Sequence, residues 1–233
     1  FTFIASANPA LYLGAELTFI DSEPNSWNMS PQALERALCD ASLENRLPKA
    51  IIVVNLYGQS ADMEKLLEIA DLFGVPIIED AAESLGAEYK HKKSGTFGKI
   101  GIYSFNGNKI ITTSGGGALV SDDEEMLSKA SFLATQAKDV APYYQHSLVG
   151  YNYRMSNVIA GVVRGQYPHL EEHIAQKKAI YMRYKEGLKD LPVSMNPYED
   201  CAVPNFWLSC MLLSEDAMKI TNPEKIRLAL EEE

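Results

Sequence analysis

Continuous apolar runs alternate with amphipathic stretches through the first half of the chain. Residues 50–54 (Ala-Ile-Ile-Val-Val) form an apolar run, which predicts a strand covered on both faces. Residues 61–73 follow with apolar side chains at helical spacing, and residues 75–79 form the next apolar run. This strand–helix–strand order predicts two parallel strands joined by a right-handed crossover.

The same alternation is expected before and after this unit. A strand is predicted at residues 17–20, followed by a helix from about Ser30 to Cys39. The Ser30 hydroxyl is suited to capping that helix, because it can accept a hydrogen bond from a free N–H group of the first turn. Later, residues 100–105 and 117–120 predict two more strands, with a loop between them.

Two helices are expected after the last of these strands. Residues 121–125 (Ser-Asp-Asp-Glu-Glu) predict a helix start, since acidic side chains interact favourably with a helix N-terminus. Residues 156–188 predict one long helix, which Pro168 should bend or interrupt.

These elements suggest three segments. We expect a large α/β domain with a mostly parallel sheet at residues 1–155, a connecting helix at 156–190 and part of a smaller C-terminal domain at 191–233. The chain opens without methionine in an apolar run and stops after an amphipathic stretch at Glu233. We therefore expect the whole protein to have further residues on both sides.

Composition and charge exclude several classes of function. A formal net charge of −10 makes nucleic acid an unfavourable partner, because binding its phosphates needs a basic face. No apolar run is long enough to span a bilayer. The three cysteines include no CxxC pair, which indicates reduced thiols in a cytoplasm. The histidines show no metal-ligand pattern, and His169 and His173 are interpreted as a solvated helix face.

An acid at a strand end and a lysine beside a glycine-rich turn carry the candidate chemistry. Asp80 follows the run 75–79, and Lys109 lies in the loop before the triplet Gly115 to Gly117. A lysine amine forms a Schiff base with the aldehyde of pyridoxal 5'-phosphate (PLP), while a carboxylate keeps the pyridine nitrogen protonated. Taken singly, Lys109 could be a surface lysine and Asp80 a helix cap. Together, beyond the carboxyl ends of parallel strands, they favour a PLP site.

The wording around these residues resembles a known family. Six segments, which follow one another in the same order as in the family, resemble the DegT/DnrJ/EryC1/StrS family of nucleotide-sugar aminotransferases. Their sequences are most similar to those of the bacillosamine-type members. The segments are Phe3–Asn8, Asn55–Gly58, Glu79–Gly86, Gly95–Gly98, Ser104–Gly117 and Gly150–Asn157.

The resemblance implies a fold, a reaction and a set of roles. It implies the aspartate aminotransferase-like fold (fold type I) of PLP-dependent enzymes and transfer of an amino group from glutamate to C4 of a UDP-linked 4-keto-6-deoxy-N-acetylhexosamine. It also implies a cytoplasmic bacterial homodimer with shared active sites. The resemblance implies that Lys109 forms the Schiff base, that Asp80 pairs with the pyridine nitrogen and that Glu83 lies near the 3'-hydroxyl of the cofactor. It also implies that Ser104 binds the phosphate, that Phe3 stacks on the cofactor ring and that Asn152 reaches the phosphate of the neighbouring subunit.

Two alternatives stay open at this stage. Related sugar dehydratases on the same fold carry histidine in place of the lysine, so Lys109 favours transamination. The second alternative is a non-catalytic relative that has kept the fold. The joint presence of Asp80, Ser104 and Lys109 argues against it. The family's Gly-Thr phosphate-binding segment is expected upstream of residue 1.

Overall fold

A four-stranded sheet forms the centre of the molecule, as a computed structural model of residues 1–233 shows. The strands follow the order β1-β2-β5-β6, in which β1, β2 and β5 are parallel and β6 is antiparallel to β5. Their bounds are β1 (Ile51–Val54), β2 (Ile77–Asp80), β5 (Ile100–Ser104) and β6 (Gly117–Val120).

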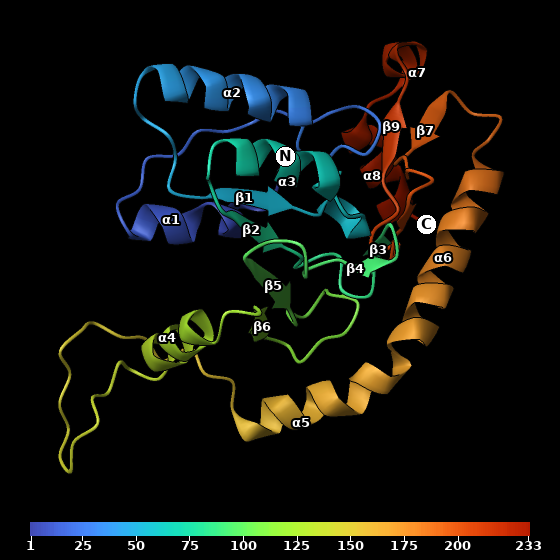
Figure 1. Ribbon diagram of the computed structural model, residues 1–233. Coiled ribbons are helices and arrows are strands. Elements are labelled where there is room, and N and C mark those ends of the chain that lie inside the picture. Colours follow the sequence, from blue (N-terminus) through green and yellow to red (C-terminus); the bar gives the residue numbers. More distant parts are fainter.

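Helices lie around this sheet. In Figure 1, α2 and α3 lie together beside β1, and α5 and α6 form a long curved arm that leads to the C-terminal elements. The helices are α1 (Asn8–Tyr12), α2 (Pro31–Leu43), α3 (Met63–Leu72), α4 (Glu124–Ala134), α5 (Asn157–Gln166), α6 (Leu170–Gly187), α7 (Glu215–Ile220) and α8 (Pro223–Glu231), with 3-10 turns η1 (Ile4–Ser6), η2 (Leu56–Gly58) and η3 (Tyr167–His169).

The core lies where the sequence places its apolar runs. Val53 of β1, Met63 and Leu66 of α3, and Ile77 of β2 are almost fully buried and belong to one cluster. The pairing of Ile51 with Ile77 sets the parallel register of β1 and β2. The predicted strand–helix–strand unit is therefore confirmed, and its apolar faces build the core.

The predicted helix boundaries also follow local chemistry. The Ser30 Oγ accepts a hydrogen bond from the Ala33 N–H (3.2 Å) at the start of α2, and Asp123 Oδ1 accepts one from the Met126 N–H (3.0 Å) at the start of α4. The long C-terminal helix is interrupted at η3, which contains Pro168. Proline has no N–H to donate, so the α-helical ladder gives way to a 3-10 turn there.

The strand expected at residues 17–20 is wrong. These residues form no strand, and Phe19 is 75% exposed. A strand needs a neighbour that pairs with its backbone groups, and no strand pairs with this short apolar run, although Ile20 packs against the core.

A buried carboxylate fixes the segment after β2. Glu79 is fully buried and accepts hydrogen bonds from Asn55 Nδ2 (2.8 Å) and from the backbone N–H groups of residues 95, 97 and 98. Because a buried carboxylate needs such donors, Glu79 ties the loop at 94–98 to the sheet next to the end of β2.

The C-terminal residues return to the first part of the chain. Strand β7 (Val193–Met195) pairs with β9 (Met211–Leu213), whereas β8 (Ala202–Val203) pairs with β3 (Glu88–Tyr89), which also pairs with β4 (Lys92–Lys93). The division into segments 1–155, 156–190 and 191–233 remains a prediction. None of the helices has the length and apolar composition needed to cross a lipid bilayer.

Candidate active site

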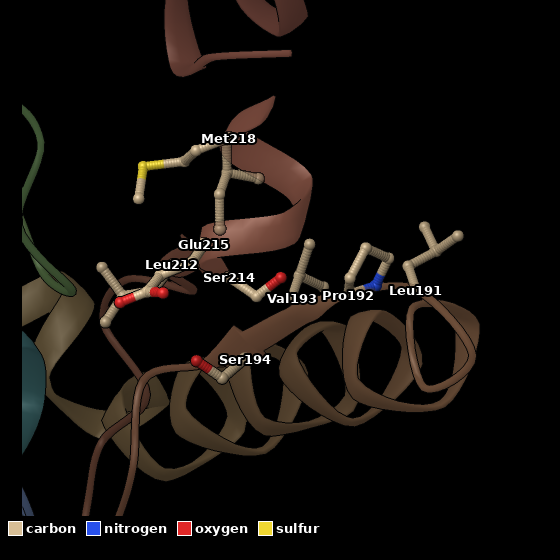
Figure 2. A pocket seen from close by; sticks show the side chains of 9 residues that line it. Leu191, Pro192, Val193, Ser194, Leu212, Ser214, Glu215 and Met218 are labelled. Atoms are coloured by element: carbon tan, nitrogen blue, oxygen red, sulfur yellow. The ribbon is translucent and has the colours of Figure 1, made fainter. Parts of the chain in front are cut away.

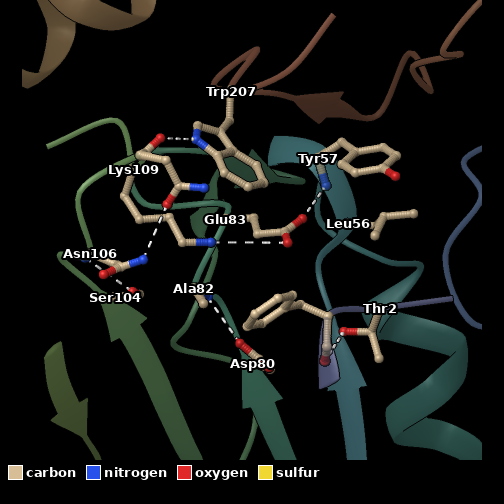
Figure 3. A network of polar contacts seen from close by, with 12 residues as sticks. Thr2, Leu56, Tyr57, Asp80, Ala82, Glu83, Ser104, Asn106, Lys109 and Trp207 are labelled. Carbon is tan, nitrogen blue, oxygen red and sulfur yellow. Dashed lines mark hydrogen bonds and ion pairs between the residues drawn. The ribbon is translucent and has the colours of Figure 1, made fainter. Parts of the chain in front are cut away.

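The candidate site lies beyond the carboxyl ends of β2 and β5. Asp80 is the last residue of β2, and its carboxylate accepts hydrogen bonds from the Ser6 Oγ (2.6 Å) and the Ala82 N–H (3.1 Å). Figure 3 shows Asp80 below Lys109 and Glu83, with Ser104 at the end of the neighbouring strand. The parallel pairing of β2 with β5 brings these strand ends together, as the sheet rule predicts.

Lys109 and Glu83 meet in the middle of these side chains, and Asp80, Glu83, Ser104 and Lys109 together form the Lys109 cluster. The Lys109 Nζ lies 4.0 Å from the Glu83 Oε1, and the two side chains are only 13% and 8% exposed. The other oxygen of Glu83, Oε2, accepts a hydrogen bond of 2.7 Å from the Tyr57 N–H. Tyr57 has a φ of +53°, an uncommon conformation for a bulky residue, and it presents its N–H to this carboxylate.

Burial moves both titratable groups toward their neutral forms. The pKa of Lys109 is lowered, chiefly by burial, although the charges of Glu83 and Asp80 oppose that shift. The pKa of Glu83 is raised, also chiefly by burial, against the Tyr57 N–H and the Lys109 charge, which both lower it. A lysine of lowered pKa is suited to attack a carbonyl carbon, because only the neutral amine is nucleophilic.

Trp207 completes the surroundings of the lysine, and sequence reasoning missed it. The Lys109 Nζ lies 4.0 Å from the centre of the Trp207 ring, and the Trp207 Nε1 donates a 2.7 Å hydrogen bond to the Asn108 carbonyl. Figure 3 shows the indole directly above the amine. The only signal in the sequence is a tryptophan in an apolar stretch near the C-terminal end, which does not point to Lys109.

The loop around Lys109 begins and ends at residues with specific conformations. Ser104 Oγ accepts a hydrogen bond of 3.2 Å from the Asn106 N–H, so the hydroxyl hydrogen can still be donated to a ligand. Gly116 has a φ of +102°, and a Cβ at Gly117 would lie 2.5 Å from the Tyr103 carbonyl oxygen. Gly116 and Gly117 therefore occupy positions that favour glycine, one for its φ and the other for its lack of a side chain.

Two expected site residues take no part in these hydrogen bonds and ion pairs. Phe3 directly precedes η1 and is 70% exposed. Asn152 lies in the exposed segment between α4 and α5, where its Oδ1 accepts a hydrogen bond of 3.0 Å from the Gln136 Nε2. The roles expected for both remain predictions.

The interpretation of the histidine pair is wrong for one member. His173 is partly buried, and its Nδ1 lies 3.0 Å from the Ile110 carbonyl oxygen, which makes it a contact of α6 to the lysine loop. His169 instead lies on the surface beside Glu172. No group of three or more His, Cys, Asp or Glu side chains is arranged to hold a metal ion.

A separate groove lies in the C-terminal segment. Figure 2 shows this groove, which has a volume of about 490 Å³ and is lined by residues of β7, β9 and α7. Glu215 is the only charged side chain among its lining residues, and the Lys109 cluster contributes none. The candidate chemistry therefore does not belong to this groove.

The donor set of the cluster fits PLP. Lys109 offers an amine whose pKa burial lowers, Asp80 offers a carboxylate at the adjacent strand end, and Ser104 offers a hydroxyl. These are the groups that an aldehyde, a pyridinium nitrogen and a phosphate require.

Comparison with known proteins agrees with this fit. The provisionally named pyridoxal phosphate-dependent aminotransferase EpsN of Bacillus subtilis is 56% identical over 214 residues, which are 91% of this chain and 55% of EpsN. The GDP-perosamine synthase of Caulobacter vibrioides is 38% identical over 190 residues, which are 82% of this chain and 50% of that enzyme. Other matched relatives are named for UDP-linked sugars.

A solved structure shares the fold. The crystal structure of a DegT DnrJ EryC1 StrS aminotransferase from Brucella abortus superposes with a TM-score of 0.85 at 32% identity, covering 94% of this chain and 59% of that chain. The chain spans about half the length of the curated relatives it matches. The model of the DegT/DnrJ/EryC1/StrS aminotransferase family matches residues 1–233. This chain therefore belongs to the DegT/DnrJ/EryC1/StrS aminotransferase family.

Proposed function

We propose that the whole protein is a PLP-dependent aminotransferase that moves an amino group from glutamate to the keto carbon of a nucleotide-linked keto-deoxysugar. The observation that carries the proposal is the meeting of Lys109 with Asp80 and Glu83 at the ends of paired parallel strands, in a chain of the aminotransferase family. When bound, PLP supplies a pyridinium ring that withdraws electrons from the reacting carbon.

Different side chains of the Lys109 cluster would bind the cofactor and transfer protons. Lys109 would hold the cofactor through its amine and, once released, would move a proton on its Nζ between the substrate carbon and the cofactor carbon. Asp80, fixed by Ser6 and the Ala82 N–H, would hold a proton on the pyridine nitrogen. Ser104 would donate its hydroxyl to the phosphate.

Phe3 and Glu83 are proposed as further cofactor contacts. The exposed ring of Phe3 would stack on the pyridine ring, and Glu83 would face the 3'-hydroxyl. A glutamate at this position also matches the bacillosamine-type members.

For the sugar, we propose C4 of a UDP-linked 4-keto-6-deoxy-N-acetylhexosamine. The resemblance of Glu79–Gly86 to bacillosamine-type members and the relatives named for UDP-linked sugars support this choice. The similarity to a GDP-perosamine synthase favours a second candidate, a GDP-linked deoxysugar.

A substrate panel separates the two candidates. The whole protein is incubated with PLP, glutamate and matched UDP- and GDP-linked keto-sugars, and both 2-oxoglutarate and the amino sugar are measured. We expect amination at C4 of the UDP-linked sugar. Amination of the GDP-linked sugar alone would favour the second candidate, and no amination with any keto-sugar would contradict the proposed function.

A homodimer with shared active sites is part of the proposal. Asn152 lies on a segment between α4 and α5 that carries exposed aromatic side chains, and exposed apolar patches of this kind mark interaction surfaces. There Asn152 would reach the cofactor phosphate of the partner subunit. The exposed aromatic side chains of the segment between α4 and α5 include Tyr143, Tyr144 and Tyr153.

We propose a cytoplasmic location in a bacterium. The three cysteines are free thiols, which suits a reducing compartment. Fractionation of cells that produce the protein should recover it with other cytoplasmic enzymes, and recovery in the membrane or medium would contradict this.

A further inference from the structure

The Trp207 indole is held against the lysine amine by contacts at both ends. Its ring centre lies 4.0 Å from the Lys109 Nζ, and its Nε1 is bonded to the carbonyl of Asn108, the residue before that lysine. Trp207 is only 5% exposed, so the indole is part of the protein interior and not a mobile surface group.

Asn205 fixes Trp207 in this place. Its Oδ1 accepts a hydrogen bond from the Trp207 N–H (2.9 Å), while its Nδ2 donates to the carbonyl oxygens of Glu83 (2.9 Å) and Leu85 (3.0 Å). Asn205 is fully buried, and its own N–H donates to the Gly58 carbonyl oxygen (2.9 Å). One amide thus joins the segments that carry Glu83 and Trp207.

The surrounding backbone is shaped for this amide. A Cβ at Gly58 would lie 2.0 Å from the Asn205 Oδ1, so the amide occupies space that only glycine leaves open. Between Asn205 and Trp207, Phe206 has a φ of +55°, which a bulky residue adopts only when its surroundings hold it. Phe206 packs between Tyr181 and Tyr198, with ring centres 5.3 and 4.9 Å away.

We propose that Trp207 is a positioning residue for Lys109. Its indole covers one side of the amine, excludes water from it and holds it toward Glu83, and Asn205 keeps the indole in that place. The proposal rests on Lys109 being the reactive lysine of the proposed function.

The indole acts on the amine in two opposite ways. Its face attracts a cation, which favours the charged amine, while its bulk excludes water, which favours the neutral amine. Burial is the larger influence on Lys109, since the pKa of its amine lies below the ordinary range despite two nearby carboxylates. Removing the indole therefore admits water and raises the pKa of Lys109.

Competitive acetylation tests this directly. The whole protein in its cofactor-free form receives brief pulses of acetic anhydride at increasing pH, and mass spectrometry gives the pH midpoint of Lys109 acetylation. We expect Trp207→Ala to move this midpoint upward, toward that of an ordinary lysine. Trp207→Phe keeps an aromatic ring over part of the amine, so the pH midpoint of Lys109 acetylation should rise less in this variant. If Trp207→Ala does not fold, the midpoint in Trp207→Phe tests the proposal.

Two controls separate positioning from simple packing. Lys92 lies 4.8 Å from the centre of the Phe97 ring but is exposed, so its acetylation should be the same in every variant. Thermal unfolding of each variant reports stability. A lower melting temperature with an unchanged or lower Lys109 midpoint would overturn the proposal, because it would reduce Trp207 to a packing residue.

The readout is independent of the reaction. It needs neither PLP nor a sugar, so a protein that aminates no keto-sugar but shows the raised midpoint would contradict only the proposed function. A protein that aminates keto-sugars with an unchanged midpoint in both variants would contradict only the role of Trp207.

Discussion

The Lys109 Nζ lies 4.0 Å from the Glu83 Oε1, in surroundings where burial favours the neutral form of each group. Each partner's charge opposes that effect on the other, since Glu83 raises the pKa of Lys109 and Lys109 lowers the pKa of Glu83. The lowered pKa of the Lys109 amine suits a group that must be neutral to react, and the nearby Glu83 carboxylate limits how far that pKa falls.

Lys109→Ala tests the reactive lysine. We expect the variant to lose the absorbance of lysine-bound cofactor and to lose transaminase turnover by several orders of magnitude, because no other amine lies in the cluster. Absorbance scans with added PLP and a glutamate-dependent assay measure both. Lys92→Ala, at an exposed position, is the control and should keep both properties. A Lys109→Ala variant that keeps them would show that the mechanism is wrong.

Glu83→Gln tests the coupling of Glu83 to the lysine. Glutamine can still accept the Tyr57 N–H but carries no charge, so the attraction that raises the pKa of Lys109 disappears and that pKa falls further. The pH midpoint of Lys109 acetylation should therefore move downward, opposite to Trp207→Ala. Glu88→Gln, which removes a charge paired with Lys93, should leave the midpoint in place. An upward move in Glu83→Gln would refute the coupling.

Asp80→Asn tests the partner of the pyridine nitrogen. Asparagine can still accept the hydrogen bond of the Ser6 hydroxyl, so some cofactor binding should remain. It cannot stabilise a positive charge on the ring, and we expect the proton transfer step to slow by about 100-fold or more. Stopped-flow measurement of a single turnover with glutamate reports this step. A rate close to that of the unaltered protein would remove Asp80 from this role.

Glu79→Gln tests the buried carboxylate beside the site. In this variant the amide N–H group faces backbone N–H donors, with which it cannot form a hydrogen bond. The charge-assisted hydrogen bonds of the fully buried carboxylate are also lost. We expect a loss of about 3 kcal/mol in the free energy of unfolding, measured with urea. Glu64→Gln, which breaks the exposed ion pair with Lys90, should cost far less, because water screens exposed charges. Equal losses in both variants would contradict the argument.

Mixed dimers test the position of Asn152. If Asn152 acts in the partner's site, a dimer of one Lys109→Ala subunit and one Asn152→Ala subunit has one site with both lesions and one with neither. Activity should then rise above that of either parent after subunit exchange, which tagged subunits verify. With impaired parents and verified exchange, no rise would place Asn152 in its own subunit's site or outside any site.

Local patterns in the sequence determined much of this fold. The apolar run 51–54, the helical spacing of 63–72 and the caps at Ser30 and Asp123 depend on side chains and backbone groups a few residues apart. The placement of Asp80 beside the lysine loop also followed from sequence, because the ends of successive parallel strands meet at one edge of a sheet.

Tertiary structure alone decided what surrounds the lysine amine. Trp207 covers Lys109, Asn205 bonds to the Gly58 and Glu83 backbone, and His173 bonds to the Ile110 carbonyl, each across a long stretch of chain. Such contacts depend on how whole elements pack and not on the spacing of residues along one element, so no local pattern announces them. The same reason explains the apolar run at 17–20, which has strand-like composition but pairs with no strand.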